Sequence, residues 1–148
     1  IDIDIDIDID INIDIDLALL ILRVGLGVMF ILHGYPKMQG GIKSWTWLGE
    51  NGMGSLGINI FPVFWGFMAA FSEFIGGIMI MLGLYTRLFA FLLFFTMIAA
   101  SAYHFSNGDS IFPSHAVELS IVFLSLFFSG AGEYSIKKIL PNRKSIYE

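Results

Sequence analysis

The sequence predicts an all-α integral membrane protein, built as a bundle of four transmembrane helices with both termini on the cytoplasmic side. The composition is the first reason: 56% of the 148 residues are hydrophobic and 14% are charged, a balance that soluble domains rarely have. The second reason is that the apolar residues form blocks about as long as the 20 residues that a helix needs to cross a bilayer.

Four hydrophobic segments are long enough to cross a membrane when helix tilt is allowed. Because they are unbroken apolar runs and not short alternating ones, we expect helices and not barrel strands. The expected segments are residues 17–37, 60–84, 87–105 and 115–129, the last continuing through Gly130 toward Tyr134. Together they form a transmembrane domain of residues 17–138, which a basic tail of residues 139–148 follows.

Lysine and arginine predict the orientation of the bundle. The C-terminal stretch IKKILPNRKS is basic, and Arg87 lies in the short connection between the second and third segments. The positive-inside rule places both on the cytoplasmic side of the membrane. We therefore expect a multi-pass protein of a bacterial cytoplasmic (inner) membrane, with Lys37 and Lys43 on the outer side as exceptions to the rule.

Residues 1–16 read IDIDIDIDIDINIDID and hold seven of the thirteen acidic residues. Seven carboxylates exclude this segment from the membrane, so we interpret it as a simple-sequence tail without an independent fold. The strict alternation leaves one alternative, an edge strand that pairs with a partner. Without these seven acids the net charge of −5 becomes +2 (−5 + 7), which is too small a basic surface to predict a nucleic-acid partner.

The connection between the first two segments, residues 38–59, is long and rich in glycine. It carries Trp45 and Trp47, and tryptophan is typical of the membrane–water interface. We expect either a lid or shallow interfacial segment over the outer end of the bundle, or a plain loop with interface anchors.

Three ionisable side chains share one stripe of the first helix. At 100° per residue, Lys37 and His33 lie about 40° and 80° from Arg23, and we expect this stripe to face the bundle interior because ionisable groups are costly against lipid. The glycines that let neighbouring helices approach this one are Gly25, Gly27 and Gly34.

Glu73 lies near the middle of the second helix, on a face of small residues. A carboxylate within the membrane needs a cation or a proton, and Arg23 is predicted to lie at a similar depth. We therefore predict an intramembrane ion pair between Arg23 and Glu73. Such a pair is either functional or a device that fixes helix register.

A second polar cluster is predicted at the outer end of the bundle. His115 and Glu118 are three residues apart on one face of the fourth helix, at the expected level of His33 and Lys37. His104, which ends the third helix, is at that level too. We interpret the cluster as a ligand pocket, the alternatives being a snorkelling lysine and isolated interface histidines. Neither metal nor haem is expected, because no HxxxH spacing occurs and the chain has no cysteine.

Three motifs in order resemble the DoxX-like family of small membrane proteins. They are LRVGLGVMFILHGYPKM, SEFIGGIMIMLGLYTRL and HAVELSIVFLSLFFSGAGEYSIKK. The resemblance implies a four-helix membrane bundle. Some relatives are subunits of thiosulfate:quinone oxidoreductase, and others are linked to quinone or catechol stress or to oxidative-stress complexes with soluble partner enzymes. The residues that match the family signatures are Arg23, His33, Lys37, Glu73, Arg87 and Glu118.

These observations favour a small membrane subunit of a redox-linked complex that binds a quinone or a similar apolar molecule near the outer ends of the first and fourth helices. His33 and Lys37 would donate hydrogen bonds to the head group, and Glu118 would pass protons. The catalytic residues are unknown, and the expected partners are membrane lipids and other membrane or soluble redox subunits. The alternatives are a non-catalytic structural or assembly subunit and a pathway for a small solute or protons.

Overall fold

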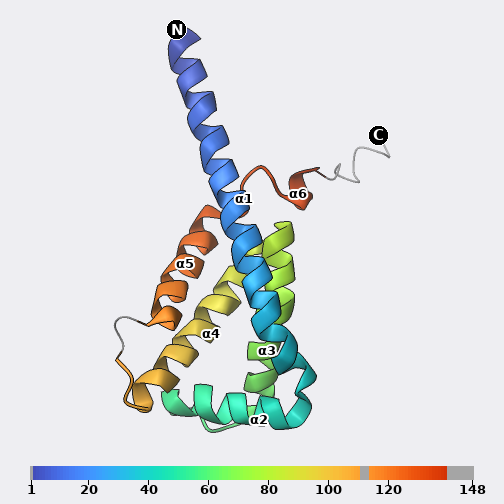
Figure 1. Ribbon diagram of the computed structural model, residues 1–148, viewed down its shortest axis with the longest axis vertical. Coiled ribbons are helices and arrows are strands. Elements are labelled where there is room, and N and C mark those ends of the chain that lie inside the picture. The colour runs from blue at the N-terminus through green and yellow to red at the C-terminus, as the bar shows by residue number, and fades with distance from the viewer. Residues whose placement is uncertain (1, 111–113, 140–148) are drawn as a thin grey trace.

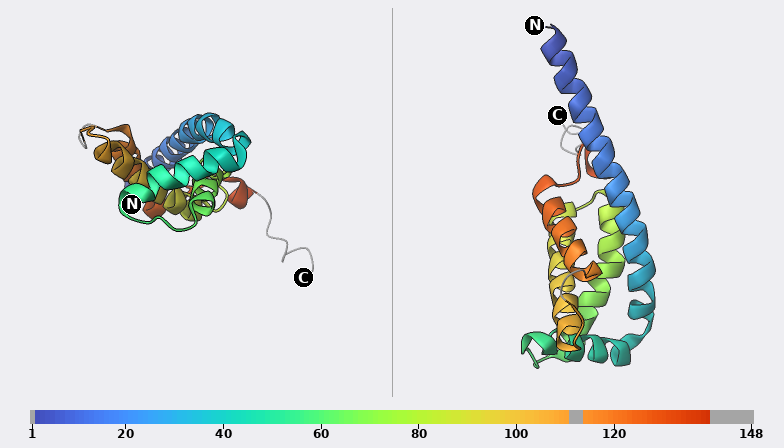
Figure 2. Two further views of the ribbon diagram at one scale, coloured as in Figure 1. Left: turned by 90° about the horizontal axis from the view of Figure 1, so that it is seen from below. Right: turned by 60° about the vertical axis from the view of Figure 1, so that its left-hand side comes forward.

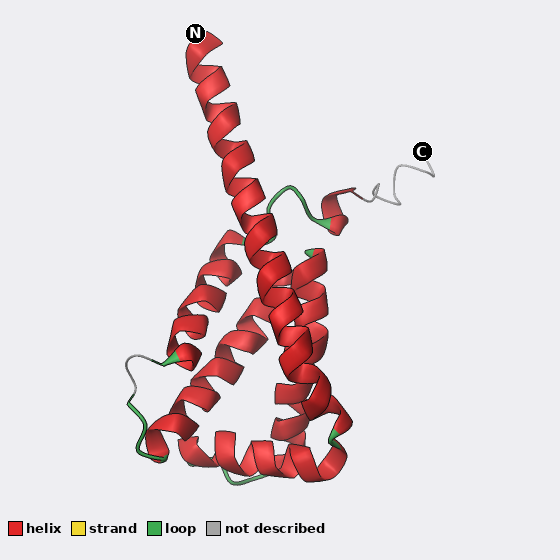
Figure 3. Ribbon diagram, viewed as in Figure 1, coloured by secondary structure: helices red, strands yellow, loops and turns green. Residues whose placement is uncertain are grey.

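The computed structural model describes residues 2–110 and 114–139, with side chains from Asp10 onward. Every regular element in these residues is helical (Figures 1 and 3), which confirms the all-α class for this part of the chain. The elements are α1 (Asp2–Gln39), α2 (Gly41–Gly52), the short 3₁₀ turn η1 (Gly54–Leu56), α3 (Pro62–Leu82), α4 (Thr86–Ser106), α5 (His115–Ser129) and α6 (Ile136–Ile139).

Three of the described helices are long and apolar enough to cross a membrane: Asp10–Gln39 within α1, then α3 and α4. Helix α5 is apolar but has 15 residues, and its length of about 22 Å is less than the hydrocarbon core of a bilayer. The expected continuation of this helix toward Tyr134 is wrong. Gly130 ends α5 with φ 77° and ψ −158°, a backbone conformation open to glycine. In place of the four predicted spanning helices, the described residues therefore contain three helices of spanning length and a shorter fourth, α5.

Helix α1 begins far before the first predicted segment, at Asp2. The Ile-Asp repeat is therefore helical, and the strand alternative is wrong. In a helix, residues two apart are rotated by 200°, so alternation spreads the aspartates around all sides and leaves no continuous apolar face. This part of α1 accordingly projects beyond the ends of the other long helices (Figure 1).

The helices pack in chain order, α1 along α3, α3 on α4 and α4 on α5. Helix α2 lies across the ends of α3 and α4 that are farthest from the chain N-terminus (Figures 1 and 2). The connection of residues 38–59 thus contains a covering helix, α2, and is not a plain loop. The buried core between the long helices is apolar, and its largest members are Phe30, Ile80, Phe89, Leu93, Phe123 and Leu126.

Glycines set the distance between α1 and α3. A Cβ atom added at Gly34 would overlap the backbone nitrogen of Phe74, and one added at Gly27 would lie 2.6 Å from the Cβ of Met81. At Gly25, by contrast, an added Cβ meets nothing within 4 Å. Two of the three glycines expected to allow close helix approach therefore do so, and Gly25 does not.

We expect Gly34→Ala to lower the free energy of unfolding by about 1–3 kcal/mol or more, because the added methyl group pushes α1 off the backbone of α3. Gly25→Ala, on the same helix and without a neighbour, is the matched control and should be neutral or slightly stabilising. Thermal unfolding of both variants in lipid nanodiscs checks this. Equal unfolding midpoints for the two variants would contradict the close packing at Gly34.

Candidate functional site

A lysine–glutamate ion pair joins α1 to α3. The Nζ atom of Lys37 lies 2.7 Å from Oε1 and 2.6 Å from Oε2 of Glu73. The Glu73 side chain is 5% exposed and that of Lys37 is 35% exposed, so the carboxylate is buried while the ammonium can still be reached from outside. The indole Nε1 of Trp45 donates to the carbonyl oxygen of Lys37 over 3.1 Å, which fixes the end of α1 against α2.

The predicted pairing of Arg23 with Glu73 is not formed, because the two side chains lie at different depths. Helices α1 and α3 run antiparallel, so Gly34 packs at Phe74 while Arg23 packs beside Gly83. Glu73 and Gly83 are separated along α3 by about 15 Å. Glu73 therefore finds its cation one helical turn beyond His33, at Lys37.

Arg23 is fully buried and is bound by backbone carbonyl groups. Its Nη1 donates to the carbonyl oxygens of Ile80 and Met81 at 3.4 and 3.5 Å, and its Nη2 donates to that of Tyr134 at 2.6 Å. The first two carbonyls belong to the last turn of α3, where a helix lacks internal donors and favours a cation. Arg23 thus ties α1 to the end of α3 and to the segment after α5.

His33 is exposed on α1. It is one helical turn from Lys37, and its ring centroid is 6.4 Å from that of Phe30. Phe30 in turn meets Phe123 of α5 edge to face at 4.9 Å. His33, Lys37 and Glu73, with this aromatic pair beside them, form what we call the α1–α3 site.

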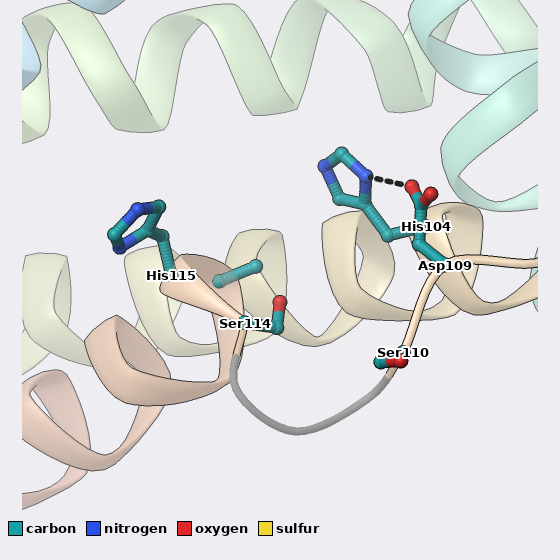
Figure 4. Close-up of a pocket in the computed structure, with 6 residues that line it drawn as sticks. His104, Asp109, Ser110, Ser114 and His115 are labelled. Carbon is teal, nitrogen blue, oxygen red and sulfur yellow. Dashed lines mark hydrogen bonds and ion pairs between the residues drawn. The ribbon is translucent and has the colours of Figure 1, made fainter.

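The remaining predicted residues gather elsewhere. Nδ1 of His115 lies 3.3 Å from Oε2 of Glu118, and Nδ1 of His104 lies 3.0 Å from Oδ2 of Asp109. A cavity of about 280 Å³ lies between the end of α4 and the start of α5 (Figure 4). We call it the α4–α5 pocket, and its lining residues are His104, Asp109, Ser110, Ser114, His115 and Ala116.

The expected outer cluster is therefore divided between two places, with His33 and Lys37 in the α1–α3 site and His115 and His104 at the α4–α5 pocket. Sequence reasoning missed Asp109, which follows His104 by five residues across a helix end, where helical spacing rules do not apply. Among the described residues, no group of three histidine or carboxylate side chains is placed to hold a metal ion.

Arg87 lies at the start of α4 and is exposed. Its guanidinium covers Gly130, at which an added Cβ would lie 3.4 Å from Nε of Arg87. The side chain therefore lies at the same end of the molecule as Arg23.

Comparison with known proteins gives one family and one relative. The model of the DoxX family matches residues 18–105. A protein of Haemophilus influenzae, described as an uncharacterized protein, is 37% identical over 119 residues, which cover 74% of this chain and 81% of that protein. No solved structure matches.

We expect Lys37→Met to lower the free energy of unfolding by about 3 kcal/mol, because it leaves the buried Glu73 carboxylate without a cation. The double variant K37M/E73Q should lose less than the sum of the two single variants, since neither charge is then left unpaired. A double-mutant cycle of unfolding free energies measures this coupling. Lys138→Met, which breaks the exposed pair with Glu133, is the control and should cost less than about 1 kcal/mol; additive single effects at Lys37 and Glu73 would contradict the pair.

We expect Arg23→Met to loosen the segment after α5, because the carbonyl of Tyr134 loses its charged donor, a bond that contributes about 1.5–3 kcal/mol. Trypsin should then cleave faster at Lys137 and Lys138, which follow that segment. The rate of cleavage, followed by mass spectrometry, is the measurement. Lys43→Met on the exposed side of α2 is the control, and an unchanged rate in Arg23→Met would show that the segment is held by other contacts.

Proposed function

This chain belongs to the DoxX family and is an integral membrane protein, and we propose that it acts as a small subunit of a redox-linked membrane complex. In this proposal it binds a quinone or a similar apolar molecule with a carbonyl-bearing head group at the α1–α3 site. The neighbouring Phe30–Phe123 contact brings α1 and α5 together beside this site.

The observation that carries the proposal is that one N–H donor of the Lys37 ammonium has no acceptor among the described residues. A lysine has three N–H donors, and two of them are directed to the carboxylate oxygens of Glu73. In the part of the chain that the structure describes, no acceptor meets the third. Because Lys37 remains partly exposed, this donor is available to the carbonyl oxygen of a bound head group.

Glu73 makes such a donor tolerable within an apolar segment. Its carboxylate neutralises the ammonium, so the site presents a donor without a net charge, which suits a neutral ligand in a medium of low dielectric constant. His33 supplies a second polar group one turn away, and the buried edge-to-face pair of Phe30 and Phe123 holds this part of α1 against α5. The exposed apolar sides of α1, such as Met29 and Leu32, let an isoprenoid tail lie in the surrounding lipid.

Electrons reach such a site from another subunit in this proposal. The sequence has no cysteine, so a thiol-based electron route would belong to a partner chain. The residues of this chain would then bind and orient the head group and move protons through groups such as Glu73, whose carboxylate already shares hydrogen bonds with Lys37.

The test is saturable binding of decylubiquinone to the full chain in nanodiscs, with free and bound quinone quantified by mass spectrometry. His33→Ala, a change at an exposed position that should leave the fold intact, is expected to weaken binding about fivefold, the effect of losing one hydrogen bond. Lys43→Ala is the matched control, because Lys43 is an exposed lysine outside the site.

Uptake that stays linear with quinone concentration and is equal in wild type and His33→Ala would show partitioning into lipid alone. Stable co-purification of larger membrane subunits without bound quinone would then support the structural or assembly role instead.

A further inference from the structure

Each of the two histidines of the α4–α5 pocket contacts a carboxylate through its Nδ1 atom. His104 comes from the end of α4 and meets Asp109, and His115 comes from the start of α5 and meets Glu118. Figure 4 shows the two rings standing on the same side of the chain, on either side of the pocket. Both rings are accessible, with side-chain exposures of 51% and 99%.

This arrangement determines which hydrogen bonds the two rings offer when both imidazoles are neutral. A carboxylate only accepts, so the Nδ1 atom beside it carries the proton of a neutral imidazole. The other nitrogen, Nε2, is then left with a lone pair and acts as an acceptor. The pocket therefore presents two acceptors, whereas the α1–α3 site presents the donor of Lys37.

We propose that the α4–α5 pocket binds the reduced form of the quinone, with the two hydroxyl groups of the ring donating to Nε2 of His104 and Nε2 of His115. This inference rests on the proposed function and extends it to the redox form of the ligand. An oxidised quinone carries carbonyl acceptors and no donor, so it cannot pair with two Nε2 lone pairs. The oxidised form is suited to the α1–α3 site, and the reduced form to this pocket.

The size and charge of the pocket agree with a neutral dihydroxy ring. Its volume of about 280 Å³ is near the lower end of small-molecule sites, which leaves room for one ring and places an attached tail outside. The carboxylates of Asp109 and Glu118 disfavour an anionic ligand by charge repulsion. The hydroxyl groups of Ser110 and Ser114 line the same cavity and can donate or accept.

The experiment compares binding of decylubiquinol and decylubiquinone to the full chain in nanodiscs, under anaerobic conditions and with a metal chelator present. Wild type should bind the reduced form about tenfold more tightly at this pocket, the effect of two hydrogen bonds between neutral groups. His104→Phe and His115→Phe should each lower this preference to about threefold, since one of the two hydrogen bonds is lost, and should leave decylubiquinone binding unchanged. Asp109→Asn tests the positioning of the His104 ring, because an amide can also donate to Nδ1 and so turn Nε2 into a donor; it should reduce the preference without a change in the unfolding midpoint.

His33→Ala separates this inference from the proposed function, since it should weaken decylubiquinone binding and leave the additional decylubiquinol binding in place. Equal affinity for the two forms in wild type, with decylubiquinone binding still sensitive to His33→Ala, would overturn the pocket and retain the α1–α3 site. Saturable binding of neither form would overturn both. A preference for decylubiquinol that His104→Phe and His115→Phe leave unchanged would place the reduced form elsewhere and overturn the assignment.

Discussion

A buried arginine must find acceptors inside the protein, and this requirement organises the described fold. The guanidinium of Arg23 is sealed from solvent and is bonded to carbonyls of Ile80, Met81 and Tyr134. Those groups belong to two segments that are far from α1 in sequence. Because an uncompensated charge in an apolar interior is very costly, the end of α3 and the segment after α5 must both come to Arg23, and α1 cannot slide along α3.

This fixed register has a consequence at the other end of the helix pair. With Arg23 beside Gly83, Gly27 and Gly34 pack against the backbone of α3, and Lys37 comes within reach of Glu73. A shift of α1 by one turn, about 5 Å, would place side chains where the glycines now allow contact and would part the lysine from its carboxylate. The Lys37 ammonium, which we assign to ligand binding, is therefore positioned by Arg23, because the hydrogen bonds of Arg23 fix the register in which α1 packs on α3.

The division of polar groups into two sites gives the molecule two different hydrogen-bonding characters. One site offers an ammonium donor whose charge is already neutralised, and the other offers two imidazole acceptors whose tautomer is set by carboxylates. Oxidised and reduced quinones differ in this same property, since one accepts and the other donates. In the proposed function, these two sites are the chemical basis on which the protein tells the two forms apart.

The sequence alone determined the helical class, the apolar segments and the local pair of His115 with Glu118, because composition and helical periodicity depend on residues close together in the chain. The family signatures, too, could be read from it. Only the tertiary structure decided that Glu73 pairs with Lys37 and not Arg23, that Arg23 binds carbonyls, and that Asp109 joins His104. These outcomes depend on the register between antiparallel helices and on how each helix ends, and neither is encoded in the spacing of residues along one segment. The Ile-Asp repeat shows the same limit, since its alternation suits a strand while its continuity with α1 makes it helical.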